Sequence, residues 1–132
     1  MRYVFSDGGR AAAGFRGTTD DCAVRAVSIA TGMPYREVYD GLFELAGKSP
    51  RKGVLRKHVE KFLHGGGAWK WTQTMGIGTG CKVHLTDDEL PSGTLIVSLS
   101  KHYAAVVDHT IYDNHDPQRD GTRCVYGYWH TH

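Results

Sequence analysis

Apolar residues between positions 20 and 65 recur every three or four residues, which is the spacing of one buried helical face. The clearest case is the text DCAVRAVSIATG, where Asp20 or Asp21 is placed to cap the start of a helix and Gly32 to end it. Two more helices are predicted on the same grounds, over residues 34–47 and about 54–64. The first half of the chain is therefore expected to be helical.

The period changes to two after the three glycines at 65–67. Short runs rich in β-branched and aromatic residues, separated by turn residues, predict an antiparallel meander. The expected strands cover residues 69–73, 82–85, 95–99, 102–107, 110–113 and 123–129, with an edge strand and a loop-like segment within 1–19. Helices followed by an antiparallel sheet predict a single α+β domain over residues 1–132, with a helical half at about 20–65 and a β half at about 69–130 that meet along one cleft.

Composition narrows the function classes. A chain of 132 residues fits one domain with a modest core, and a net charge of +2 is too small to indicate a nucleic-acid partner. The start MRYVFSDGGR has no apolar signal segment, and no stretch approaches the roughly 20 apolar residues that span a bilayer, so we expect a cytoplasmic protein with no membrane partner. Three widely spaced cysteines predict free thiols rather than a disulfide framework: Cys22, Cys81 and Cys124.

Cys22 is the strongest candidate for chemistry. It falls in the first turn of the clearest helix, where unpaired backbone amides and the positive end of the helix dipole favour a thiolate over a thiol. A free cysteine is also often only a small buried apolar residue. The polar neighbours Asp20 and Asp21 favour a cleft position over such a packing role.

His102 opens the strand HYAAVV and is the candidate base for Cys22. If Asp108 and His109 form a two-residue hairpin turn, period-two alternation puts His102 and Asp113 on one sheet face, diagonally adjacent. Asp113 is then the group that orients the imidazole. If the loop were one residue longer, Asp116 or Asn114 would take the place of Asp113 as the group that orients the imidazole.

The segments DCAVRAVSIATG, KHYAAVV and YDNHDP resemble the papain-like cysteine peptidase superfamily, especially its small bacterial members related to the leader-cleaving peptidases of bacteriocin exporters. The resemblance covers about half of the chain. It implies a papain-like fold of bacterial or phage origin and a Cys-His-Asp triad that hydrolyses a peptide or isopeptide bond. It implies no particular substrate.

One departure from that family concerns the oxyanion. Its members commonly carry a glutamine six residues before the cysteine, a position that Arg16 occupies here. Thr18 or Thr19 is therefore a candidate side-chain donor beside the Cys22 backbone N–H. The candidates for walls and covering loop of the substrate cleft are Trp69, Trp71, Gly78 and Gly80, although core packing explains the tryptophans at least as well.

A zinc site built from Cys81, His84 and Cys124, with His130 and His132 nearby, is the rival chemistry. Only one pair in it has ligand-like spacing, so no metal and no cofactor is expected. The function predicted is a cysteine hydrolase acting on a protein or peptide, and the sequence does not fix its oligomeric state. The alternatives are an inactive papain-like protein-binding module and a cell-wall amidase or acyltransferase using the same thioester chemistry.

Overall fold

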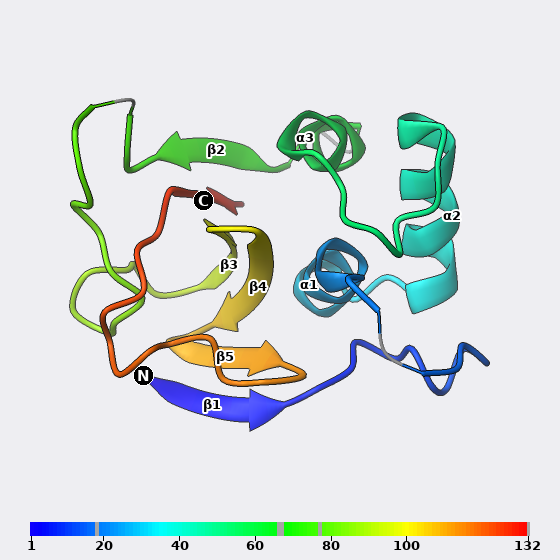
Figure 1. The fold of residues 1–132 in the computed structure, drawn as a ribbon, viewed down its shortest axis with the longest axis horizontal. Coiled ribbons are helices and arrows are strands. Elements are labelled where there is room, and N and C mark those ends of the chain that lie inside the picture. The colour runs from blue at the N-terminus through cyan, green and yellow to red at the C-terminus, as the bar shows by residue number, and fades with distance from the viewer. Residues whose placement is uncertain (18, 66–67, 77, 132) are drawn as a thin grey trace.

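The computed structural model describes residues 1–17, 19–65, 68–76 and 78–131. Three helices gather on one side of a curved six-stranded sheet (Figure 1). The helices are α1 (Cys22–Thr31), α2 (Tyr35–Ala46) and α3 (Arg56–His64). The strands are β1 (Arg2–Phe5), β2 (Lys70–Gln73), β3 (Thr94–Leu99), β4 (His102–Val107), β5 (Thr110–Asp113) and β6 (Gly127–His130). The α+β expectation is confirmed at this level.

The helix boundaries follow the predicted signals closely. Gly32 ends α1 in the left-handed conformation, with φ of 76°, and its N–H bonds to the Ser28 carbonyl at 2.9 Å. Pro34 was expected as the first helical residue but lies just before α2, because its ψ of 141° is extended. Its carbonyl still accepts the first helical hydrogen bond, from Val38 N–H at 3.2 Å.

The sheet order is β1-β5-β4-β3-β6-β2. The expectation of a wholly antiparallel sheet is wrong at one edge, because β1 pairs with β5 in parallel and thereby joins the N-terminal segment to the C-terminal half. The strand expected over residues 82–85 is also wrong. Within the described residues that segment contributes only one isolated bridge, between His84 and Cys124.

The sheet is covered on both faces. Ile96 and Trp129 are cross-strand neighbours whose side chains join the core formed with the three helices. Leu95 and Val97, which point the other way, pack with Leu85 and other residues from the loop before β3. Because both faces of β3 are buried, its sequence is an apolar run rather than an alternation of apolar and polar residues.

The expectation of three free thiols is wrong for two of them. Cys81 and Cys124 form a disulfide, which ties the long loop after β2 to the segment before β6. Cys22 is therefore the one free cysteine of this chain, and it is buried. This leaves a single thiol for nucleophilic chemistry.

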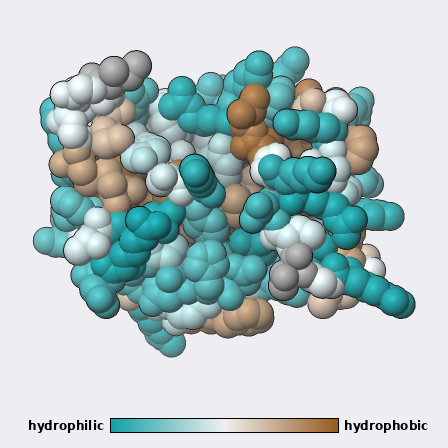
Figure 2. Space-filling model, in the orientation of Figure 1, coloured by the Kyte–Doolittle hydropathy of each residue, from teal (hydrophilic) through white to brown (hydrophobic). Residues whose placement is uncertain are grey.

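The exterior shown in Figure 2 is mainly hydrophilic, with isolated hydrophobic patches. Among the described residues there is no helix whose length and hydropathy would let it cross a membrane.

Candidate functional site

The β4–β5 hairpin brings His102 and Asp113 together at one end of the sheet. Asp108 and His109 form its turn with positive φ values of 47° and 64°, the conformation that a tight two-residue hairpin needs. Val107 then pairs with Thr110, as the sequence predicts. His102 Nε2 lies 2.5 Å from Asp113 Oδ2, a short hydrogen bond between a ring nitrogen and a carboxylate.

Cys22 completes the group from the first turn of α1. Since Nε2 of His102 is taken by Asp113, Nδ1 is the ring nitrogen left for the Cys22 sulfur. Burial acts to lower the pKa of His102, but hydrogen bonds to Asp113 and Cys22, together with their negative charge, overcome it and raise the pKa to about 9. The imidazole is thus held in its protonated form at neutral pH.

Both oxygens of Asp113 are occupied. Oδ2 bonds His102, while Oδ1 lies 3.3 Å from Arg25 Nη2 and accepts the Asn114 backbone N–H at 2.8 Å. Burial acts to raise the pKa of Asp113, but the bond to His102, the imidazolium charge and these other contacts lower it overall. The carboxylate is therefore charged and has little freedom to turn.

The backbone of Asp113 is held as well. Its carbonyl accepts the Tyr3 hydroxyl at 3.1 Å and the Ser6 N–H at 2.8 Å. The first residues of the chain, which sequence analysis assigned only an edge strand, therefore fix the position of the carboxylate.

A buried ionic network lies behind the site. Asp21 is 1% exposed and receives contacts from Arg25, from Arg10 at 3.5 Å and from the Tyr35 hydroxyl at 2.6 Å. Arg10 also contacts that hydroxyl at 2.7 Å. Opposite charges thus alternate along Arg10, Asp21, Arg25, Asp113 and His102 up to the thiol. Sequence analysis did not find this network, and its one available signal was the four-residue spacing of Asp21 and Arg25 on an apolar helix.

The network leaves the start of α1 open. Asp21 precedes the helix, yet its side chain makes no capping hydrogen bond with any described amide of the first turn. Its carboxylate is directed to Arg25, Arg10 and Tyr35 instead. The backbone N–H groups of the first turn, including that of Cys22, have no partner within the helix, and an N-cap side chain would normally accept a hydrogen bond from the second or third of them.

Cys22 and His102 both line a groove of about 530 Å³, a volume typical of ligand sites. Its other walls come from the segment between α2 and α3, including Val54 and Leu55, and from the β3–β4 turn. The predicted cleft between the helical and β halves is present at this position.

Other sequence candidates lie elsewhere. Trp71 packs on Trp129 with ring centroids 4.6 Å apart, and both Trp69 and Trp71 pack against the helix-side core, so the prediction that they wall the cleft is wrong. Gly78 and Gly80 lie on an exposed loop and do not line the groove. The tertiary packing of the β2–β6 edge, which local pattern does not specify, places the tryptophans in the core.

Of the two threonines considered as oxyanion donors, the structure describes only Thr19. Thr18 lies outside the described residues. The Thr19 hydroxyl is buried with no hydrogen-bond partner among the described residues, but Thr19 is not part of the groove, where Asp20 lies instead. The Arg16 side chain is exposed and absent from the groove lining.

The two alternative orienting residues do not contact His102. Asp116 is exposed and accepts hydrogen bonds from Gln118, and the Asn114 side chain is 2.8 Å from Nδ1 of His115. The exact two-residue turn excludes the register in which either would replace Asp113.

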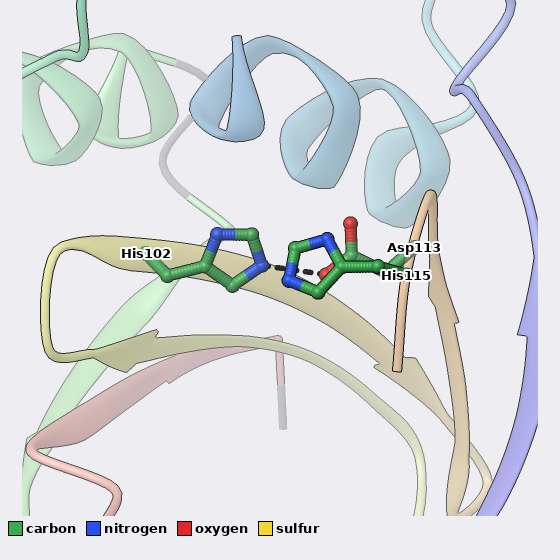
Figure 3. Close-up of side chains that lie close together, drawn as sticks. All are labelled: His102, Asp113 and His115. Carbon is green, nitrogen blue, oxygen red and sulfur yellow. Dashed lines mark hydrogen bonds and ion pairs between the residues drawn. The ribbon is translucent and has the colours of Figure 1, made fainter. Parts of the chain in front are cut away.

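His115 is a neighbour that sequence analysis missed. Figure 3 shows it beside His102 and Asp113, below α1, and its ring centroid is 4.9 Å from that of His102. Donor atoms of these three residues lie within 4.8 Å of one another, close enough to be considered for a metal ion. A metal there would have to displace the His102–Asp113 hydrogen bond and lie near the Arg25 cation, so the geometry favours an ion pair over a metal centre.

The zinc cluster considered from the sequence does not form among the described residues, which do not include His132. Its two thiols are joined as a disulfide, and His84 bonds Glu89 at 3.2 Å. Searches of protein families, curated proteins and solved structures found no match to this chain.

Proposed function

We propose that this protein is a papain-like cysteine hydrolase that cleaves an amide bond in a protein or peptide, with Cys22 as nucleophile, His102 as acid and base, and Asp113 as the group that orients the imidazole. The observation that carries the proposal is the 2.5 Å bond between Asp113 and His102, whose remaining ring nitrogen is available to the one free thiol. A helix-starting cysteine, a strand-opening histidine and a strand-ending aspartate also occur in the chain order of the papain-like family.

In the reaction that we propose, the Cys22 sulfur attacks the amide carbon and the carbonyl oxygen becomes an oxyanion near the open end of α1. The imidazolium of His102 gives its proton to the amide nitrogen, the C–N bond breaks and the amine leaves. Water then attacks the resulting thioester while His102 takes its proton. The C–S bond breaks, the acid product leaves, and the Cys22 thiolate beside the His102 imidazolium is restored.

The surrounding network supports this role because it supplies preorganisation. Arg25 and the Asn114 N–H hold one carboxylate oxygen of Asp113, which leaves the other directed at His102. Fixing the acceptor fixes the ring tautomer and orientation without any rearrangement during reaction.

An activated ester tests the proposal without knowledge of the natural substrate. p-Nitrophenyl acetate should give a burst of p-nitrophenolate and a protein mass increased by one acetyl group at Cys22, both absent from Cys22→Ala. Asp113→Asn should slow the burst strongly. Absence of a burst from the unmodified protein would contradict a hydrolase and favour the binding-module alternative.

A further inference from the structure

Three lysines line the groove that contains Cys22 and His102. Lys48 and Lys52 come from the segment between α2 and α3, and Lys101 comes from the β3–β4 turn. All three are exposed, and none forms an ion pair with an acid in the described part of the chain. Asp20 is the single acidic residue of the lining.

The backbones of two lysines are tied to the reacting groups. Lys52 forms an isolated parallel bridge with Asp20, two residues before Cys22. Lys101 directly precedes His102 and is held in a tight turn, with φ of 53°. The positive charges are therefore built into two different walls of the groove.

Three lysines against one acid leave the groove lining with a net positive charge, a feature that folding does not require. A cleft lined by one sign of charge focuses its field and raises the local concentration of oppositely charged ligands. The groove also presents apolar surface, since Leu55 is 55% exposed and Val54 and Tyr103 lie beside it. The complementary ligand combines acidic groups with apolar ones.

We infer that the groove selects acidic polypeptide segments, with Asp or Glu side chains flanking the bond presented to Cys22 and an apolar residue against Leu55. This inference rests on the proposed function for the position of the scissile bond. Polypeptide is favoured over nucleic acid because the thiol and imidazole suit a carbonyl carbon, and because apolar walls offer nothing to a phosphate backbone.

The electrostatic potential around the Cys22 sulfur can be measured with two alkylating reagents of nearly equal size, anionic iodoacetate and neutral iodoacetamide. The ratio of their rates, divided by the same ratio for glutathione, reports the local potential. We expect replacement of all three lysines (Lys48→Gln, Lys52→Gln and Lys101→Gln) to lower this ratio by about 3- to 10-fold in low salt. In 1 M salt the difference should nearly vanish, since screening then acts within about 3 Å.

A matched variant controls for net charge. Lys61→Gln, Lys70→Gln and Lys82→Gln remove the same number of exposed lysines outside the groove and should leave the ratio unchanged. The His102 imidazolium also attracts iodoacetate, but it is present in both variants, so the comparison isolates the lysines. Equal ratios in the two triple variants would overturn the inference.

A second measurement addresses the ligand class. A capped peptide of alternating Glu and Leu should protect Cys22 from iodoacetamide at concentrations at which its Lys–Leu counterpart does not. Protection by an oligonucleotide but not by the acidic peptide would overturn the polypeptide assignment. The rate with iodoacetamide alone tests whether the Cys22 thiol is activated. A reactive thiol with no preference for the anionic reagent would overturn the inferred preference for acidic polypeptides but would not contradict the proposed hydrolase function.

Discussion

Arg25 Nη2 lies 3.3 Å from Oδ1 of Asp113, the carboxylate whose other oxygen bonds His102. The two residues are 88 positions apart and come from α1 and the end of β5. The same arginine bonds Asp21, one residue before the cysteine. One buried guanidinium therefore joins the start of the nucleophile's helix to the acid that orients the base.

Loss of that guanidinium should be costly. Arg25→Met leaves Asp21 and Asp113 buried with less compensation, and we expect the free energy of unfolding to fall by about 3–5 kcal/mol. The exposed Arg36–Asp40 pair has the same four-residue spacing, so Arg36→Met is a matched control expected to cost less than about 1 kcal/mol. Urea denaturation measures both. Equal costs would contradict a structural role for the buried network.

A positioning role for Arg25 makes a separate prediction in the folded protein. In Arg25→Lys, which keeps the charge but loses the forked geometry, the burst with p-nitrophenyl acetate should slow while the fold is retained. An unchanged burst would show that Asp113 needs no clamp from Arg25.

The pKa values of the neighbouring residues His102 and His115 should be shifted in opposite directions. The pKa of His102 is raised to about 9 and that of His115 is lowered, chiefly by burial and despite the nearby Asp113 charge. Imidazole NMR signals followed from pH 5 to 10 should show His115 losing its proton first. In Asp113→Asn the pKa of His102 should fall, because a main source of its stabilised charge is removed. Titration of both rings near the ordinary value of about 6.5 would contradict the ion pair.

The same shift predicts how stability depends on pH. A raised pKa in the folded state means that the His102 contribution is fully present below about pH 6.5 and is lost as pH rises through about 9. The pKa of Asp113 is lowered in the folded state, so the contribution of this carboxylate to stability is present at neutral pH. It is lost in acid, as pH falls through the folded-state pKa of Asp113. Unfolding measured from pH 6 to 9.5 should show a decline that His102→Gln reduces. An identical decline in that variant would assign it to other groups.

Gly8 should tolerate a side chain worse than Gly14 does. Both have positive φ, 70° and 90°, so alanine strains the backbone of each by about 1–2 kcal/mol. A Cβ at Gly8 would lie 2.9 Å from Arg25 Cα, whereas one at Gly14 meets nothing within 4 Å. Gly8→Ala should therefore cost at least about 1 kcal/mol more than Gly14→Ala, as thermal denaturation can measure. Equal losses would mean that the chain before α1 does not pack tightly on Arg25.

The hairpin and the helices could be predicted because their determinants are local. The Asp108–His109 turn sets the β4–β5 register over a few residues, so His102 and Asp113 could be placed on one face from sequence alone. Gly32 likewise marks the end of α1 by its own conformation. Each of these features depends on neighbours close in the chain.

The features that sequence analysis missed all depend on distant segments. The parallel pairing of β1 with β5, the disulfide between Cys81 and Cys124, and the contact of Arg25 with Asp113 join residues far apart in the chain. The pattern around Trp71 allowed either a cleft wall or a core position, because it does not reveal that Trp129 and Gly127 lie against the indole ring. Tertiary packing, rather than local propensity, decides such positions.

The most direct test of the account is the rate at which iodoacetamide alkylates Cys22 at pH 6, in the unmodified protein and in His102→Ala, with the Cys81–Cys124 disulfide intact so that one thiol is free. An ordinary thiol is only about 0.3% thiolate at this pH, whereas a thiol paired with an imidazolium stays reactive. The account predicts that the unmodified protein reacts at least about 10-fold faster than His102→Ala, with Asp113→Asn in between. Equal, slow rates in all three proteins would contradict it, because Cys22 would then be a buried thiol without an activating partner.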